Sequence, residues 1–422
     1  MRKLARIAKF SHFFYTPAMQ TIRRKNYEAV LWQLKDKRLI KAVTGVRRCG
    51  KSTLLNLFRD SLAQSVPSGQ IQSYNFEAPE NLRVGDWLNW YDKICADLAP
   101  GKANYIFLDE AQAIPGFEKL LDGLHIRPDV DLYVTGSNAR LLSSELATLL
   151  TGRAFEINIL PFSFAEFVQA QPVGQSPERL FAEYLQTSSF PQAVDLARTS
   201  RPLMTAYLRE VYASILEKDL AAKRRIGSKR SFQNVVNFVV DSIGSPLSPH
   251  KIASRLQVED KAVDSRTVDD YLSLLTGSYL FYKVSRYDIK GKAHLATQEK
   301  YYLVDAGLRH ALLGKDLAAD SGHVLENIVY LELLRRGNQV WLGKIGNAEV
   351  DFVVRDRDGY TQYIQVAQTV QQPETLAREL APFDKIPDHN PRLLLTMDWQ
   401  TGSRNGVRQL NVVDWLLGET ER

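Results

Sequence analysis

The stretch TGVRRCGKSTLL, residues 44–55, lies between a short apolar run and a segment with helical spacing. Residues 39–45, LIKAVTG, have the β-branched content and the closing glycine of a buried strand. The residues that match the pattern G-x-x-x-x-G-K-[ST] are Gly45, Gly50, Lys51 and Ser52. A strand, a glycine-rich turn and a helix N-terminus in this order direct backbone N–H groups at an anion. The stretch therefore predicts a phosphate-binding loop.

Four further segments have the composition of strands, and helical patterns separate them: residues 71–77, 104–110, 131–138 and 154–160. Strands that alternate with helices favour a parallel sheet with helices on both faces. Continuous apolar runs such as YIFL fit a sheet that is buried on both sides. The predicted fold class of this region is therefore α/β.

Two consecutive acids, Asp109 and Glu110, end the apolar strand predicted at residues 104–110. A phosphate-bound Mg²⁺ needs oxygen ligands, which Ser52 and Asp109 can supply. Glu110 is placed to polarise an attacking water as a general base. Consecutive strand residues point to different sides, so the two acids can have separate roles. The pattern predicts ATP and Mg²⁺ as cofactors.

The loop residues are expected to surround the phosphates, and Lys51 is expected to reach the β- and γ-phosphates. The residues expected to contact nucleotide are Gly45, Arg47, Arg48, Cys49, Gly50, Lys51, Ser52 and Thr53. Arg47 and Arg48 make the loop more basic than a phosphate site requires. Phosphate, a neighbouring subunit and solvent stay open as their partners.

Two polar residues beside later strands are further candidates. Asn138 ends a predicted strand, where its side chain can order the lytic water, although Ser-Asn also favours a turn. Arg153 follows Gly152 just before the last strand of this region. A charged residue at this junction suits an arginine finger that completes a neighbouring subunit's site. A solvated loop arginine is the alternative.

Composition limits the class of protein. A chain of 422 residues is too long for one ordinary core and predicts two or three domains. No apolar run approaches the roughly 18 residues of a membrane helix, so we expect no membrane span. The cysteines, Cys49 and Cys95, form no C-x-x-C pair, which fits the cytoplasm and excludes a cysteine zinc site. The net charge of +6 permits an acidic partner such as nucleic acid.

Residues 240–315 have the outline of a winged helix, with two short helices followed by a hairpin. The helices begin near Ser248 and Ser265, and a Lys-Gly-Lys turn at residues 290–292 separates two strand-like runs. Adjacent aspartates on the second helix disfavour its entry into a DNA groove. DNA backbone contact is expected instead through the basic residues of the hairpin, Lys283, Arg286, Lys290, Lys292 and Lys300. A packing module is the alternative.

The last block begins with SGHVLENIVYLELLRRG, which reads as a long amphipathic helix closed by Gly337. The segments AEVDFVVRD and YTQYIQVAQ, around an Arg-Asp-Gly turn at residues 357–359, predict a hairpin.

The order of the N-terminal motifs resembles that of the AAA+ ATPases. The resemblance implies a role for each matching position: a magnesium-binding acid, a catalytic glutamate, sensor 1, an arginine finger and a polar residue that restrains the glutamate. In that order these positions are Asp109, Glu110, Asn138, Arg153 and Asn75.

A narrower resemblance covers roughly residues 20–415. The motifs GVRRCGKSTLL, LDEAQ, TGSNARLL, TGRAFEINILPFSFAEF and GSPLS…TVDDYL look like those of a bacterial and archaeal family. Its members join an AAA+-type ATPase to a C-terminal domain of unknown function. This sequence departs from the family at residues 187–194, where relatives carry Gly-Gly before Phe-Pro. Ser188 and Ser189 are expected to stiffen a hinge there.

The last block also resembles the restriction-endonuclease-like fold, an α+β fold. The resemblance implies a metal site built from Glu326, Asp351 and a carboxylate–x–Lys pair on the next strand. Here that pair reads Gln365-Val366-Ala367, so an acid and the lysine are replaced. Glu349 adds an acid but no base. The expected degenerate site comprises Glu326, Glu349, Asp351 and Gln365, in a domain that binds or scaffolds rather than cleaves.

Five parts are predicted: a basic extension (residues 1–19), an AAA+ core (20–165), a helical lid or connector (166–239), a winged-helix module (240–315) and a nuclease-like domain (316–422). The expected protein is a cytoplasmic Mg²⁺-dependent ATPase whose nucleotide state positions the tail on DNA or on a regulatory protein. An action of Arg153 in trans implies a homo-oligomer. The alternatives are an ATP-regulated DNA nuclease or junction-processing protein, and an ATP-bound interaction scaffold without turnover.

Overall fold

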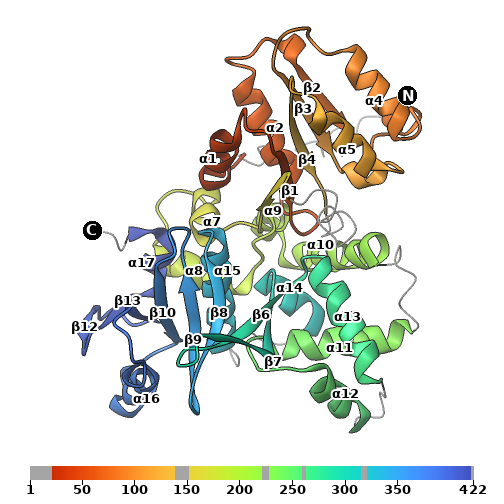
Figure 1. Ribbon diagram of the computed structural model, residues 1–422. Coiled ribbons are helices and arrows are strands. Elements are labelled where there is room, and N and C mark those ends of the chain that lie inside the picture. Colours follow the sequence, from red (N-terminus) through yellow and green to blue (C-terminus); the bar gives the residue numbers. More distant parts are fainter. Residues whose placement is uncertain (1–20, 138–151, 221–227, 259–262, 315–320, 420–422) are drawn as a thin grey trace, which may run out of the picture.

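The computed structural model describes residues 21–137, 152–220, 228–258, 263–314 and 321–419 (Figure 1). The first sheet has five parallel strands in the order β2-β3-β4-β1-β5. These strands are β1 (Ile40–Thr44), β2 (Ile71–Asn75), β3 (Asn104–Asp109), β4 (Val130–Thr135) and β5 (Ala154–Asn158). The parallel sheet confirms the predicted α/β class of this region.

Helices cover both faces of the first sheet. They are α1 (Lys25–Leu34), α2 (Lys51–Leu62), α3 (Pro79–Leu82), α4 (Trp87–Ala96) and α5 (Phe117–Ile126), with 3-10 turns at Ser68–Gln70 and Ala111–Ala113. Val43 of β1 lies in one hydrophobic cluster with Phe58 of α2. The preceding residue, Ala42, lies in a second cluster with Leu121 of α5. Because successive strand residues point to opposite faces, β1 is held between two cores.

A helical block occupies the region predicted as a lid. Its helices are α7 (Phe164–Ala170), α8 (Pro177–Gln186), α9 (Pro191–Thr199), α10 (Arg201–Ser214), a π-helical segment (Ile215–Leu220) and α11 (Lys229–Asp241). Ser163 and Glu166 form a capping box at the start of α7, in which each side chain accepts the other residue's backbone N–H. This cap fixes the direction in which the chain enters the helical block.

The predicted helix pair and hairpin are present, but the hairpin is not a separate wing. Its elements are α12 (Pro249–Val258), α13 (Ser265–Gly277), β6 (Phe281–Asp288), β7 (Ala293–Leu303) and α14 (Ala306–Leu313). β6 and β7 pair antiparallel, as predicted. β6 also pairs in parallel with β8, where Arg286 lies opposite Leu342. The hairpin is therefore the edge of the second sheet, and residue 315 does not mark a boundary between sheets.

The second sheet has eight strands in the order β12-β13-β11-β10-β9-β8-β6-β7. The remaining elements are α15 (Ser321–Arg335), β8 (Gln339–Ile345), β9 (Ala348–Arg355), β10 (Thr361–Ala367), α16 (Pro373–Asp384), β11 (Arg392–Thr396), β12 (Gly402–Arg404), β13 (Val407–Asn411) and α17 (Val412–Leu417). The predicted hairpin of β9 and β10 is confirmed.

Helix α15 differs from its predicted amphipathic form. Every residue from Val324 to Leu333 is buried. The prediction of one solvent-facing side is wrong because α15 contacts strands of the second sheet and also contacts α14 (Figure 1). Because it is enclosed, α15 connects the second sheet with α14.

Some predicted features lie outside the described residues. These are the basic extension at residues 1–19 and the candidate Asn138. Within the described ranges, no helix combines the length and the apolar character that crossing a membrane requires.

Candidate nucleotide site

The loop between β1 and α2 has a backbone that requires glycine at two positions. Gly45 has a φ of 137°, and a Cβ atom there would lie 2.2 Å from the carbonyl oxygen of Ile159. Gly50, the residue before α2, has a φ of 101°. Both values lie in the region that favours glycine. The two glycines therefore allow the loop to turn closely over the start of α2.

Lys51 begins α2, and the loop encloses its ammonium group. The residue is 4% exposed, and Nζ donates hydrogen bonds to the carbonyl oxygens of Gly45 (3.0 Å) and Val46 (3.1 Å). Both of these described partners are neutral. A buried positive charge held in this way is stabilised by an anion, and the N–H groups of the adjoining helix end add further donors. The residues therefore fit a phosphate group.

Three oxygen-bearing side chains meet beside the loop. The Ser52 hydroxyl donates to Asp109 Oδ1 at 2.9 Å. The Thr135 hydroxyl donates to the same oxygen at 2.6 Å and accepts the backbone N–H of Glu110 at 2.8 Å. Hydroxyl and carboxylate oxygens this close can belong to one Mg²⁺ shell. Ser52 and Asp109 therefore fit the predicted magnesium ligands, and Thr135 positions both acids.

Glu110 leaves the strand direction immediately after Asp109. Its φ is 55°, a left-handed value that is uncommon for a residue with a side chain. Gln112 Nε2 donates to Glu110 Oε2 at 2.5 Å. The left-handed turn separates the two consecutive carboxylates, and Gln112 holds the second one in place. Asp109 and Glu110 consequently have different partners, as their separate predicted roles require.

The loop and the acids line one cavity of about 700 Å³, a volume typical of ligand pockets. All predicted loop contacts except Gly45 line it: Arg47, Arg48, Cys49, Gly50, Lys51, Ser52 and Thr53. Residues from outside the loop contribute the rest of the wall, and they include Ile22, Arg24, Leu57, Phe162, Pro191, Gln192 and Tyr207. In this cavity apolar side chains lie beside polar and basic ones. This combination fits a nucleotide better than a free phosphate ion.

The two loop arginines have different surroundings. Arg47 pairs with Glu77, which follows β2, at 2.8 Å. Arg48 is exposed and adopts a positive φ of 68°. Burial raises the pKa of Tyr207 on α10, and the nearby Arg48 opposes that rise. Arg47 therefore points toward the end of β2, whereas Arg48 lies near Tyr207 of the helical block.

Asn75 makes a different contact from the restraint of Glu110 that the AAA+ resemblance implies. Strand pairing places Asn75 beside Asp109. Its side-chain oxygen accepts the backbone N–H of Glu77 at 2.9 Å, which closes a turn after β2. In the described residues Gln112 takes the position next to Glu110 that was expected for Asn75.

Arg153 lies at the amino ends of the strands of the first sheet, whereas the loop lies at their carboxyl ends. Its carbonyl oxygen accepts the N–H of Ile40, the first residue of β1, whereas the loop follows the last residue of that strand. The five residues of β1 separate these two ends by roughly 15 Å. The Arg153 side chain forms an ion pair with Asp122 of α5 and is about half exposed. This position excludes a direct role in its own chain's loop and leaves an action in trans open.

Arg24 is a site residue that the sequence does not reveal, because it lies in a short basic stretch typical of a surface. Its guanidinium is buried and donates to the carbonyl oxygens of Leu160 (2.8 Å) and Cys49 (3.4 Å). It also forms two hydrogen bonds with the carboxylate of Glu166, at 2.9 and 2.7 Å. Burial would raise the pKa of Glu166, but Arg24 outweighs this effect and lowers it. Arg24 thus lines the cavity and holds the Cys49 carbonyl group of the loop.

The second candidate cluster gathers around a lysine of the hairpin. Lys300 Nζ lies 2.9 Å from Glu326 Oε1 and 3.1 Å from Glu349 Oε1. Asp351 accepts the N–H of Val366 at 2.8 Å, and its own N–H donates to Gln365 at 3.3 Å. The structure therefore brings together all the residues of the predicted degenerate site and adds Lys300, which the sequence places on a wing.

The charges of this cluster compensate one another. Burial alone would lower the pKa of Lys300, but the carboxylates around it raise the pKa above its ordinary value. Burial, reinforced by Glu326, raises the pKa of Asp351 to about 8. Within the described ranges no group of three or more His, Cys, Asp or Glu side chains is arranged to hold a metal ion. The Lys300 ammonium neutralises part of the negative charge of Glu326 and Glu349.

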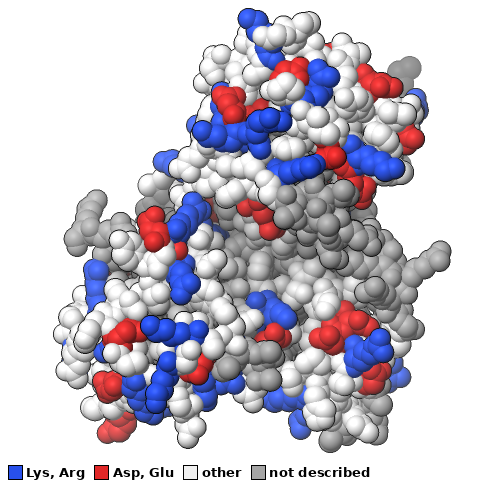
Figure 2. Space-filling model, in the orientation of Figure 1, with Lys and Arg blue, Asp and Glu red and all other residues white. Residues whose placement is uncertain are grey.

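Three of the five hairpin residues predicted to contact DNA are paired or buried, which reduces the number of cations that remain for such a contact. Arg286 is buried against Gln298, Lys300 is buried among carboxylates, and Lys283 pairs with Glu299 at 3.0 Å. Lys290 and Lys292 are exposed, and Lys283 is about half exposed beside Glu299. The cause is the pairing of β6 with β8, which turns part of the hairpin inward. On the face shown in Figure 2, basic and acidic side chains are interspersed.

The sequence of this protein matches two described families and an uncharacterized relative. Residues 37–168 match the family described as AAA domain, and residues 178–318 match a family described as a domain of unknown function (DUF8612). An uncharacterized protein of Haemophilus influenzae is 38% identical over 94% of this chain and 98% of its own length. The chain belongs to the family of that protein, and its N-terminal part is an AAA-type P-loop domain.

More distant similarities extend to an archaeon and to solved structures. An uncharacterized protein of Methanocaldococcus jannaschii is 25% identical over 82% of this chain and 78% of its own. The Walker-type ATPase of Pyrococcus abyssi is 14% identical, with a TM-score of 0.47 over 69% of this chain and 96% of that chain. The Aeropyrum pernix ORC1 protein in complex with DNA is 13% identical, with a TM-score of 0.31 over 72% and 95%.

Proposed function

We propose that this protein is a Mg²⁺-dependent ATPase of AAA+ type whose nucleotide state positions the second sheet on DNA or on a regulatory protein. The observation that carries the proposal is the meeting of Lys51, the Ser52–Asp109 pair and Glu110 on one cavity. An AAA domain implies nucleotide binding, typically with Mg²⁺. The buried ammonium and the close hydroxyl–carboxylate pair both fit that ligand.

The residues divide the chemistry among them. Lys51 would hold the β- and γ-phosphates, and Ser52 and Asp109 would hold Mg²⁺, which neutralises phosphate charge when bound. Glu110 would accept a proton from the attacking water, and Gln112 keeps its carboxylate in place. Thr135 fixes both acids through one hydroxyl. A binding scaffold without turnover would still need Asp109 for Mg²⁺ but would need no general base, so the positioned Glu110 favours hydrolysis.

The tail favours positioning over cleavage. Gln365 and Ala367 replace the acid and the base of the nuclease pattern. Lys300 is tied to Glu326 and Glu349 and is not available as a free base. An ATP-regulated nuclease or junction-processing protein is therefore the weaker alternative. Binding at the tail, with nucleotide turnover in the first domain, fits these residues best.

The proposed function is tested by ATPase rates with and without duplex, single-stranded and branched DNA at two salt concentrations. We expect intrinsic Mg²⁺-dependent turnover without DNA. A DNA contact through Lys290 and Lys292 alone predicts stimulation whose apparent affinity falls with a log–log salt slope of about −2. Stimulation lost in the Lys290→Ala/Lys292→Ala variant would assign DNA as the partner. Turnover that no DNA changes would favour a protein partner over DNA, and no turnover at all would contradict the proposed ATPase.

Replacement of Arg153 by alanine is expected to slow ATP turnover at protein concentrations that permit assembly. Fingers supplied in trans typically contribute rate factors on the order of 10³–10⁵, so we expect a loss of at least about tenfold. The control is Arg127→Ala, which removes a surface arginine paired with Asp129 at the same edge of the sheet. Equal rates for wild type and the Arg153→Ala variant at every concentration would remove this role.

A further inference from the structure

The segment at residues 159–163, ILPFS, joins β5 to α7, contacts the start of the phosphate loop and contributes Phe162 to the cavity wall. We call it the junction segment. The N–H of Ile159 donates to the carbonyl oxygen of Thr44 at 2.9 Å. The Ile159 carbonyl oxygen is the atom that a Cβ on Gly45 would meet. A shift of the junction segment therefore displaces the backbone at the start of the loop.

The junction segment and the loop also share the Arg24 guanidinium. Arg24 Nη1 donates to Leu160 O at 2.8 Å and to Cys49 O at 3.4 Å. Nη2 donates to Pro161 O at 3.3 Å. One buried cation thus links two consecutive carbonyl groups of the junction segment to a carbonyl group within the loop, and the bidentate pair with Glu166 restricts its movement.

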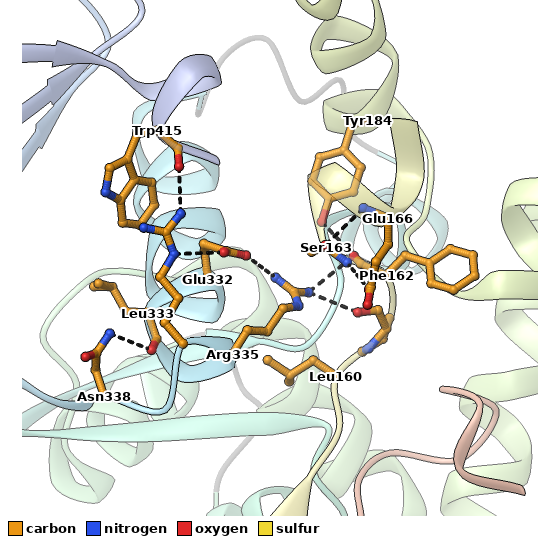
Figure 3. A network of polar contacts seen from close by, with 12 residues as sticks. Leu160, Phe162, Ser163, Glu166, Tyr184, Glu332, Leu333, Arg335, Asn338 and Trp415 are labelled. Atoms are coloured by element: carbon orange, nitrogen blue, oxygen red, sulfur yellow. Dashed lines mark hydrogen bonds and ion pairs between the residues drawn. The ribbon is translucent and has the colours of Figure 1, made fainter. Parts of the chain in front are cut away.

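A second arginine reaches the junction segment from the C-terminal half of the chain. Arg335, the last residue of α15, donates from Nη2 to Pro161 O at 3.1 Å and to Phe162 O at 3.2 Å (Figure 3). Its side chain is 5% exposed. Charged donors on carbonyl groups in buried surroundings hold them more firmly than neutral donors do. Arg335 therefore holds the carbonyl groups of residues 161 and 162, in the same short stretch of backbone that Arg24 connects to the loop.

The contacts continue from Arg335 into the tail. Glu332 lies 3.4 Å from Arg335 Nη1 and 3.0 Å from Arg336 Nε. Arg336 Nη2 donates to Trp415 O at 2.6 Å, and its guanidinium lies 4.0 Å from the centre of the Trp415 ring. In Figure 3, Glu332 and Arg335 lie between Trp415 and the junction segment. The chain of contacts is continuous in the described residues.

The junction segment also borders the second wall of the cavity. Phe162 N donates to Ser189 O at 2.8 Å, and Ser189 donates to the buried carboxylate of Asp305 from both its N–H and its hydroxyl. Helix α9 begins two residues later, and its first residues, Pro191 and Gln192, line the cavity. Displacement of the junction segment consequently affects both the loop and this facing wall.

We propose that Arg335 is a positioning residue for the nucleotide site. Through Arg335, the position of α15 and α17 sets the affinity of the loop for nucleotide. The proposal rests on the proposed nucleotide site and adds a regulator to it. Arg335 touches neither the cavity nor the loop, and acts only through Pro161 O and Phe162 O. Because coupling between two sites is reciprocal, a partner that moves α15 changes nucleotide affinity, and nucleotide changes the stability of the α15 contacts.

The test compares Arg335→Gln with Arg336→Gln, measuring equilibrium binding of a fluorescent ATP analogue with Mg²⁺ well below the melting temperature. Both variants remove one positive charge from neighbouring positions, but only the first loses the bonds to the junction segment. Arg336 still pairs with Glu332 in the Arg335→Gln variant, so that carboxylate is not left without a cation. We expect affinity to fall roughly tenfold in Arg335→Gln, within the usual range of coupling. Arg336→Gln should lose less affinity than Arg335→Gln, because it removes contacts with Trp415 and Glu332 but leaves the bonds of Arg335 to the junction segment in place.

The Arg335→Lys variant separates positioning from a general loss of stability. A lysine reaches the same carbonyl groups with fewer fixed donors, so we expect affinity between those of wild type and Arg335→Gln. In steady-state kinetics the loss should appear mainly in KM, because the catalytic acids are not touched. Equal affinity in wild type and Arg335→Gln, or equal losses in Arg335→Gln and Arg336→Gln, would overturn the proposal. A wild-type protein that binds no nucleotide would instead overturn the proposed function.

Discussion

Replacement of Lys51 by alanine is expected to abolish measurable ATP binding. The ammonium is buried in the loop, and its two described partners are neutral carbonyl groups. Its loss removes the charge that compensates the phosphates, and hydrogen bonds to charged groups contribute about 1.5–3 kcal/mol each. Two such bonds correspond to at least roughly a hundredfold loss of affinity. Isothermal titration calorimetry with Mg²⁺-ATP measures this directly.

A matched control keeps this result interpretable. Lys25 is an exposed lysine at the start of α1, and Lys25→Ala should bind ATP like the wild type. The Lys51→Ala variant should melt at a temperature close to that of the wild type without nucleotide, because it removes a charge with no acidic partner among the described residues. ATP affinity that stays unchanged in a folded Lys51→Ala protein would eliminate the proposed site.

Replacement of Glu110 by glutamine is expected to preserve ATP binding and to reduce turnover by more than about tenfold. Glutamine keeps the shape of the side chain and can still accept the hydrogen bond from Gln112. It cannot accept a proton from water, and general-base effects typically amount to factors of about 10²–10⁴. Binding should stay within about threefold, because Lys51, Ser52 and Asp109 are unchanged.

The measurement is single-turnover phosphate release beside equilibrium binding of the same preparation. Glu80→Gln is the control, since it removes an exposed acid in α3 that does not line the cavity. A Glu110→Gln variant that hydrolyses ATP at the wild-type rate would remove the general-base role. It would leave the binding site itself intact, so the two substitutions test separate claims.

Local patterns were sufficient to predict the first domain. The apolar runs, the glycine spacing and the consecutive acids each report a short stretch of backbone, and all five strands lie close to their predicted ranges. Ser52 and Asp109 meet because parallel strands bring loop and acid to one edge of the sheet. Thr135 could have been inferred in the same way, since it ends the strand next to Asp109.

Contacts between distant segments were not predictable from one sequence. Arg24 and Lys300 look like surface cations in their local context, but each is buried against carboxylates far along the chain. The periodicity of α15 shows apolar positions without showing that neighbours cover every side. Parallel pairing of β6 with β8 has no local signal, because it depends on where an entire later segment packs.

This pairing has a mechanical consequence. The hydrogen bonds of one continuous sheet join the hairpin of residues 281–303 to the last hundred residues, so the two cannot swing independently. If the helical block rotated, the hairpin of residues 281–303 and the edge strand β12 would therefore move together as parts of one sheet.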